Sequence, residues 1–160
     1  MKYAKPDLVG IALFDRLDKP LPDDMGATGL QWRKRELENY LCTEEVLSAY
    51  ARYDQLDDLF GRAEAARRGK AMQESIAEIS SALKTLKKPD PWSSDIKATD
   101  VFLDPLFDKY FEKLGLSNLL RKADYHVLAR LVSKEKIDPE IIEKLDAIVE
   151  VAKKAKPRED

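Results

Sequence analysis

The sequence predicts a mainly α-helical fold that includes one or two short strands, and three observations support this. Apolar residues recur at helical spacing through the middle and the C-terminal part of the chain. Proline and glycine stand at the ends of these periodic stretches. One short continuous apolar run, typical of a buried strand, lies near the N-terminus. We expect segments 1–42, 43–90 and 91–160 to form one compact unit.

Composition limits the classes of protein to which the chain can belong. With 160 residues, 44% hydrophobic and 36% charged residues and a net charge of -2, it is predicted to be one soluble domain. The near balance of charges excludes a strongly basic nucleic-acid-binding surface as a property of the whole chain. One cysteine, Cys42, excludes an internal disulfide and favours a cytoplasmic setting. The apolar run is too short for a signal peptide or a membrane span, so no membrane contact is expected.

The N-terminal segment is expected to contain the strands. The run from Leu8 to Phe14 predicts a strand that is buried on both faces and ends at Asp15. An acid in that position lies at the edge of a sheet, where ligands bind in α/β folds. Prolines, glycines and acids then predict a loop, and a second short strand is expected near Leu30–Arg33.

The stretch from Gly29 to Leu41 alternates charged and apolar residues more tightly than an ordinary surface segment. Trp32 is interpreted as a packing residue. The basic run Arg33, Lys34 and Arg35 has two interpretations: it contacts phosphates, or it is solvated or paired with Glu36 and Glu38.

Two helices are predicted in the middle of the chain. Thr43 is the N-cap of the first, which continues through Leu56, Leu59 and Phe60 and is closed by Gly61. The second begins near Arg62 and ends before Pro89 and Pro91, where Trp92, Ser93 and Ser94 form a hinge. Its apolar stripe predicts either a core-facing surface or a short coiled coil with another chain; the stripe consists of Met72, Ile76, Ile79, Leu83 and Leu86.

Three further helices are predicted after the hinge. Asp104 and Pro105 start the first of them, which Gly115 ends. Another covers 123–132. Asp138 and Pro139 start the last helix, whose apolar face consists of Ile141, Ile142, Leu145, Ile148, Val149 and Ala152.

Acidic residues near the end of the first strand are candidate metal ligands. Asp15 and Asp18 supply the hard oxygen ligands that magnesium prefers, and a third carboxylate from the segment Glu36–Glu38 would complete a site. Such a site could activate water and stabilise a phosphoryl transition state. From spacing alone, the interpretation of Asp15 and Asp18 as ordinary turn acids is favoured.

Two stretches resemble a known family. The run Val-Gly-Ile-Ala-Leu-Phe-Asp-Arg at 9–16 and the run Trp-Arg-Lys-Arg-Glu-Leu-Glu-Asn-Tyr-Leu at 32–41 resemble the Toprim region of OLD-family nucleases. In these proteins an ABC-type ATPase domain precedes a Toprim nuclease domain. Segment 117–129 resembles the family more loosely. The resemblance implies a partial Toprim-like α/β core in 1–42, a helical insertion in 43–90 and C-terminal helices in 91–160.

The resemblance also implies roles for individual residues. Asp15 matches the first acid of the Toprim Asp-x-Asp motif, a ligand of Mg2+, for which Mn2+ can substitute. Glu38 matches a metal-holding acidic position that also takes part in catalysis, with Glu36 as the substitute. Lys122 matches a catalytic lysine that stabilises charge on the scissile phosphate. The sequence departs from the motif because Leu17 occupies the place of the second acid and Asp18 comes one residue late.

Two functions are therefore expected from different classes. The first is the C-terminal Toprim portion of an OLD-like, ATP-dependent endonuclease that cleaves DNA, with its ATPase domain in cis or in trans. A family-like glutamate strand would lie upstream of Met1, and without it the isolated chain would be inactive. The alternative is a non-catalytic helical module for dimerisation or for docking to an ATPase partner. A homo-oligomer is expected in either case.

Overall fold

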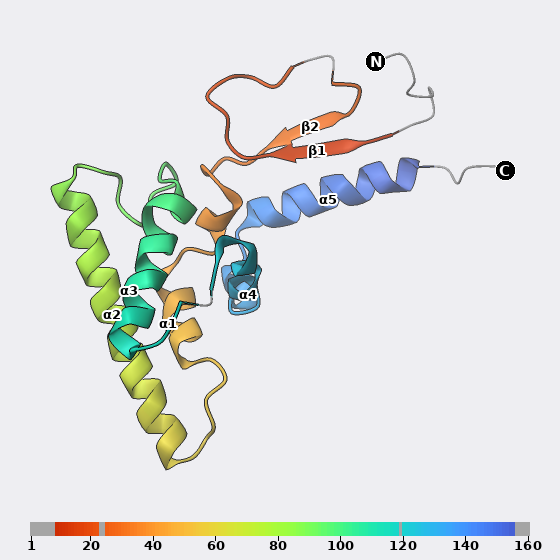
Figure 1. Cartoon of the computed structure of the whole chain (residues 1–160). Coiled ribbons are helices and arrows are strands. Elements are labelled where there is room, and N and C mark those ends of the chain that lie inside the picture. Colours follow the sequence, from red (N-terminus) through yellow and green to blue (C-terminus); the bar gives the residue numbers. More distant parts are fainter. Residues whose placement is uncertain (1–8, 23–24, 119, 156–160) are drawn as a thin grey trace.

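A computed structural model describes residues 9–22, 25–118 and 120–155 of this chain. The fold is mainly helical and contains a short two-stranded sheet, as predicted. Figure 1 shows α1, α2 and α3 side by side in one helical body, whereas the sheet and α5 extend from its upper end. The connection between these two parts positions the candidate site.

The sheet is made of two parallel strands, β1 (Ile11–Phe14) and β2 (Thr28–Gln31). Each is four residues long, and Ile11 pairs with Thr28 at one end while Phe14 pairs with Gln31 at the other. The strand predicted from Leu8 is shorter than expected within the described residues, and β2 begins before the predicted Leu30. Burial on both faces was a wrong prediction, because all four residues of β1 are only half-buried.

The first helix begins as predicted but ends earlier. In α1 (Glu44–Arg52) the Thr43 hydroxyl accepts a hydrogen bond from the Val46 amide at 3.2 Å. The helix ends at Arg52 because Tyr53 is extended and Asp54 has a left-handed backbone with φ of 61°. The predicted end at Gly61 was therefore wrong.

Gly61 instead lies in the first turn of α2 (Leu59–Thr85), where its amide donates to the N-cap carboxylate of Asp58 at 2.7 Å. A Cβ atom at Gly61 would lie 1.9 Å from the carbonyl oxygen of Leu56. The glycine thus lets the loop fold back against the start of the helix. This sharp corner leaves Leu56, Leu59 and Phe60 exposed, contrary to the prediction that they continue a buried stripe.

The stripe in α2 faces the core of its own chain. Met72, Ile76 and Leu83 are buried and Ile79 is half-buried, where α2 packs against α1 and α3. The core-facing interpretation is confirmed for these residues, whereas Leu86 lies beyond the helix and is exposed. Even α2, with 27 residues, is not apolar enough to cross a membrane, and neither is any other helix in the described ranges.

The helix α3 (Asp104–Leu114) continues directly from a π-helical turn, Ala98–Leu103. Asp104 therefore has helical backbone angles and is not the predicted N-cap; its carboxylate accepts the Tyr125 hydroxyl at 2.5 Å. Gly115 ends α3 with φ of 68°, as predicted. Much of the buried core lies on and around α3 and includes Phe102, Leu103, Leu106, Phe107, Tyr110, Tyr125 and Leu128.

The C-terminal part is less helical than predicted before Asp138. Only α4 (His126–Ala129) and a 3-10 turn, Lys122–Asp124, form where a helix over 123–132 was expected. The last helix, α5 (Pro139–Lys154), starts as predicted, because the Asp138 carboxylate accepts the Glu140 amide at 3.0 Å. Its predicted apolar face is largely open to solvent, and its fully buried residues in this structure are Glu140 and Lys144.

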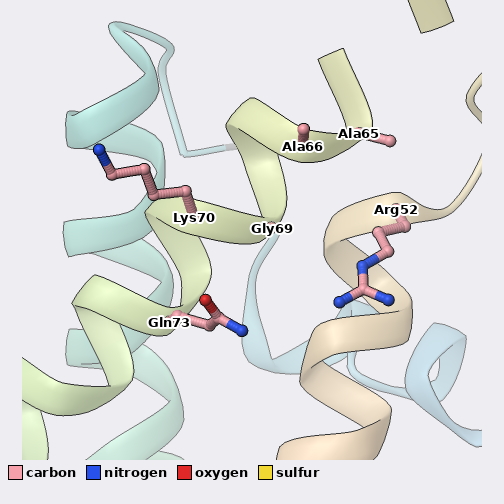
Figure 2. Close-up of a pocket in the computed structure, with 6 residues that line it drawn as sticks. All are labelled: Arg52, Ala65, Ala66, Gly69, Lys70 and Gln73. Atoms are coloured by element: carbon pink, nitrogen blue, oxygen red, sulfur yellow. The ribbon is translucent and has the colours of Figure 1, made fainter. Parts of the chain in front are cut away.

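Replacing Gly61 by alanine is expected to lower the free energy of unfolding by roughly 1–3 kcal/mol. The new methyl group would clash with the Leu56 carbonyl, which belongs to the backbone and cannot move as a flexible side chain could. Gly69→Ala in the same helix is the matched control. Its Cβ would lie 3.6 Å from the Arg52 Nε atom, an ordinary contact, so helix propensity should stabilise this variant by up to ~1 kcal/mol. Figure 2 shows Gly69 and Arg52. Urea unfolding of both variants measures the difference, and equal stabilities would contradict the contact at Gly61.

Candidate functional site

The residues that follow β2, Trp32 to Cys42, join the sheet to the helical body and to α5; we call them the junction segment. Trp32 continues the ladder by donating its amide to the Phe14 carbonyl at 3.0 Å. Its side chain is buried, and its ring centroid lies 5.1 Å from that of Tyr40. The packing interpretation of Trp32 is confirmed.

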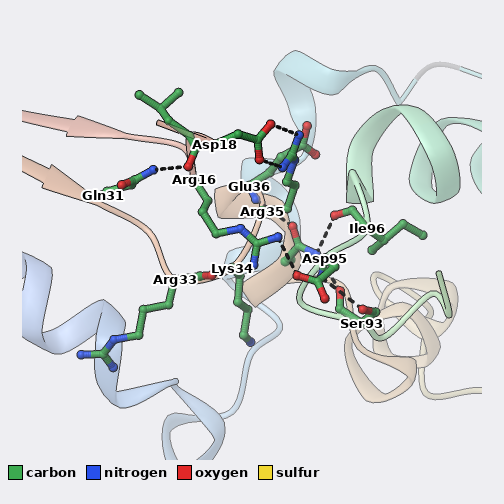
Figure 3. A network of polar contacts seen from close by, with 12 residues as sticks. Arg16, Asp18, Gln31, Arg33, Lys34, Arg35, Glu36, Ser93, Asp95 and Ile96 are labelled. Carbon is green, nitrogen blue, oxygen red and sulfur yellow. Dashed lines mark hydrogen bonds and ion pairs between the residues drawn. The ribbon is translucent and has the colours of Figure 1, made fainter. Parts of the chain in front are cut away.

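The basic run in the junction segment is paired with acids from distant parts of the sequence. Arg33 contacts Glu143 at 2.6 Å and Lys34 contacts Asp138 at 3.2 Å, which ties the segment to α5. Arg35 contacts Asp18 at 2.8 Å. Figure 3 shows these side chains pointing in different directions from one short stretch. Ion pairing is thus observed, although the partners are not the predicted Glu36 and Glu38.

Arg16, which follows Asp15 in the loop after β1, strengthens the same connection. Its guanidinium donates to the Arg33 carbonyl at 3.1 Å and pairs with Asp95 at 2.6 Å. The backbone amide of Arg16 donates to the Arg35 carbonyl at 3.2 Å, and the backbone amide of Arg35 donates to the Ser94 carbonyl at 2.8 Å. The loop after β1, the junction segment and residues 93–95 are therefore held together.

A buried carboxylate, Glu140, fixes the start of α5. The side chain is 3% exposed; one oxygen accepts the Arg33 amide at 2.9 Å, and the other accepts the Tyr40 hydroxyl. The same hydroxyl accepts the Lys34 amide at 3.2 Å, and the buried Lys144 ammonium lies 3.7 Å from Glu140. Burial, helped by the bond to Glu140, raises the pKa of Tyr40 to about 12. From the sequence, Glu140 is predicted only as an acid in the first turn of a helix. No local signal indicates that its carboxylate is buried and fixes the start of α5.

Glu36 and Asn39 bind the junction segment to the helical body. The Glu36 side chain is 7% exposed and accepts the amide of Thr99, at the start of the π-helical turn, at 3.0 Å. The Asn39 amide group donates to the carbonyls of Ser93 and Ile96, both at 3.0 Å. Residues 92–94 were predicted to be a hinge, but the bond from Asn39 holds Ser93 and the bond from the Arg35 amide holds Ser94 in place.

The structure gives each predicted site residue a distinct setting. The pKa of Asp18 is lowered by its hydrogen bond and charge interaction with Arg35. The buried Glu36 carboxylate accepts the backbone amide of Thr99. Asp15 directly follows β1 and is exposed, and Glu38 is half-buried in the 3-10 turn Leu37–Tyr40. Lys122 is exposed in a separate 3-10 turn after α3, and within the described residues no ion pair joins it to these acids.

These residues do not fit a complete magnesium site. Across the described ranges, no group of three or more His, Cys, Asp or Glu side chains is placed to hold a metal ion. Asp18 is occupied by Arg35, and Glu36 is occupied by a backbone amide. Asp15 and Glu38 are the acids of the predicted set that have no side-chain bond within the described residues.

Comparisons with models of protein families, with curated proteins and with solved structures found no match for this chain. The resemblance to OLD-family Toprim nucleases therefore stays a prediction from two short stretches.

Replacing Tyr40 by phenylalanine keeps the ring beside Trp32 but removes the hydroxyl, which donates to Glu140 and accepts from the Lys34 amide. We expect a loss of about 1–3 kcal/mol in the free energy of unfolding, because a buried carboxylate loses a donor. Tyr53→Phe is the matched control, since Tyr53 is exposed, and it should change stability by less than ~0.5 kcal/mol. Chemical denaturation followed by circular dichroism compares the two variants. Equal effects would show that the Glu140 network contributes nothing.

The fold should lose stability at alkaline pH, within the pH range in which an ordinary exposed tyrosine titrates. Burial raises the pKa of Cys42 from 9.0 and that of Tyr110 from 10.0, in each case to about 12. Because the folded state holds these protons more tightly, the stabilisation is complete below about pH 9 and is lost as pH rises through 12. Urea midpoints measured from pH 8 to 11 should fall, and Cys42→Ala should make the fall shallower. An unchanged slope in this variant would contradict the assignment to Cys42.

Proposed function

We propose that this chain is a non-catalytic interaction module that docks onto a protein partner through its small sheet and helix α5. The observation that carries the proposal is a pair of parallel strands with no third strand beside them in the described part of the chain. Parallel strands normally lie inside larger sheets that are covered on both faces. We therefore infer that this half-buried pair of strands is the edge of a larger sheet that forms with a partner.

The outer edges of β1 and β2 offer backbone groups for such an extension. Each strand pairs on one side only within the described residues, and an exposed strand edge is a template for another strand. The connections of Arg16, Arg33 and Arg35 hold this short sheet in place although little apolar surface supports it. A partner strand would meet a preformed edge.

The exposed stripe of α5 adds an apolar contact surface. Ile142, Leu145 and Val149 follow one another at steps of three and four residues and are 52%, 55% and 48% exposed. Glu140 and Lys144 are buried, so the orientation of α5 is set by polar contacts and not by this stripe. Exposed apolar surfaces of this kind mark protein contacts.

The partner we propose is an ABC-type ATPase protein with Toprim strands, in cis or in trans, as the resemblance implies. In that assembly this chain would serve as a helical scaffold of an OLD-like endonuclease. The scaffold role depends on the surfaces described above and requires no complete metal site on the chain itself.

A photoreactive amino acid placed at Leu145 tests the docking surface in cells of the natural host. We expect cross-linking to an ABC-type ATPase protein from this position, whereas the same group at Glu112, exposed on α3, should give none. Leu145→Asp, probed from position 149, should abolish the cross-link while the isolated variant melts like the parent, because position 145 is exposed. Equal cross-linking from positions 145 and 112 would contradict the proposal.

A second candidate is direct participation in metal-dependent phosphodiester cleavage of DNA. The specific observation that favours it is Asp15, which stands at the carboxyl end of a parallel strand and is exposed. Because the other acids in the described ranges do not gather around it, most ligands would have to come from the partner.

Calorimetric titration of Mn2+ into the chain tests this second candidate. If the chain carries part of a metal site, binding should be measurable in the parent and lost in Asp15→Asn and Glu38→Ala. Asp18→Asn is the control, because this carboxylate is already paired with Arg35 and should not matter. Absence of Mn2+ binding in the parent would exclude a metal site on the isolated chain and leave the interaction module.

A further inference from the structure

A second exposed apolar surface lies at the corner between α1 and α2, away from the sheet. Four large side chains of this corner are more exposed than the stripe of α5: Tyr53 is 57%, Leu56 75%, Leu59 71% and Phe60 83% exposed. They lie within eight consecutive residues around the loop that Gly61 holds against the helix. We call residues 52–60 the corner.

Next to the corner, a cavity of about 280 Å³ opens between α1 and α2. Figure 2 shows the Arg52 guanidinium and the Gln73 amide directed into the gap between the two helices. On the α2 side the small residues Ala65, Ala66 and Gly69 leave room, and Lys70 and Gln73 complete the lining. An acidic side chain could enter here and reach the guanidinium.

The Arg52 side chain makes no hydrogen bond or ion pair with any residue in the described ranges, in contrast to the side chains of the neighbouring arginines. Arg62 is paired with Asp57 at 3.3 Å, and both Arg67 and Arg68 are paired with Glu64 at 2.8 and 2.7 Å. The planar guanidinium is suited to bidentate binding of a carboxylate. Lys70, the other cation of the cavity lining, pairs with Glu74 at 3.8 Å. Within the described ranges, Arg52 is therefore the cation of this surface that is free to bind a carboxylate.

The corner also carries a free acid. Asp54 is exposed, lies two residues after Arg52 and makes no side-chain bond within the described part of the chain. Its left-handed backbone, with φ of 61°, turns the chain sharply at this point. The same surface thus presents one unpaired positive charge, one unpaired negative charge and an apolar patch.

We propose that the corner is a homodimer interface in which two copies of this chain meet around a two-fold axis. A two-fold interface pairs residue i with residue j and residue j with residue i. Arg52 of each copy would then bind Asp54 of the other at the mouth of the cavity, and Leu56, Leu59 and Phe60 would pack against their counterparts. A second copy is the favoured occupant because the surface is complementary to itself in charge and in polarity. The corner is separate from the sheet and α5, so dimerisation there is independent of docking to the proposed partner.

Charge exchange between two variants tests this arrangement. Arg52→Asp alone and Asp54→Arg alone place like charges opposite each other in a homodimer, so each should sediment as a monomer at concentrations where the parent is a dimer. An equimolar mixture of the two variants restores two opposite-charge pairs and should dimerise again. Far-UV circular dichroism of each variant confirms that it is folded. A parent that is monomeric at all concentrations, or a mixture that stays monomeric, would overturn the proposal.

The apolar part is tested by Phe60→Ser, which should weaken dimerisation about tenfold or more, since a large central aromatic side chain is lost from the interface. Leu86→Ser is the matched control, because Leu86 is also exposed, at 66%, but lies beyond the opposite end of α2. Analytical ultracentrifugation gives both dissociation constants. An equal change in the two variants, or none in Phe60→Ser, would place the interface elsewhere.

Discussion

Burial of the Glu140 carboxylate is the constraint on which the arrangement of this chain depends. Removing a carboxylate from water costs several kcal/mol unless hydrogen bonds and a counter-charge replace the solvent. Here the Arg33 amide, the Tyr40 hydroxyl and the Lys144 ammonium supply them. The arrangement forms only when α5 meets the junction segment in one position, so a polar requirement and not apolar packing sets the direction of the last helix.

The remaining polar contacts of the junction segment extend that constraint in two directions. Asn39 and Glu36 hold the segment against the helical body, while Arg16 and Arg35 hold the loop that follows β1. The exposed ion pairs among these contribute little individually. The buried bonds of Glu36 and Asn39 contribute more, because breaking one leaves a desolvated polar group. The short sheet is thus stabilised mainly by the segments that flank it.

Features that depend on local chemistry could be predicted from the sequence. Thr43 and Asp138 cap helices and Gly115 ends one, because caps need only their immediate neighbours. The break between α1 and α2 could not be predicted, since it depends on how closely the Leu56 carbonyl approaches Gly61. The partners of the basic run were missed for a similar reason, because Arg33 and Glu143 are 110 residues apart. Of the candidate acids, Asp18 and Glu36 were predicted as metal ligands, and only the fold shows that an arginine and a backbone amide already contact them.

The helical body and α5 are held by different forces, so the two regions differ in their sensitivity to temperature and to salt. The body is closed by apolar side chains such as Met72, Leu106 and Phe107, whose contribution weakens on cooling. The attachment of α5 includes exposed pairs such as Arg33 with Glu143, and charges of this kind are screened over about 10 Å at 0.1 M salt. High ionic strength therefore weakens the exposed pairs at the end of the molecule that carries the sheet, while low temperature weakens the apolar core. Conditions that leave the core intact can thus still change how α5 is presented to a partner.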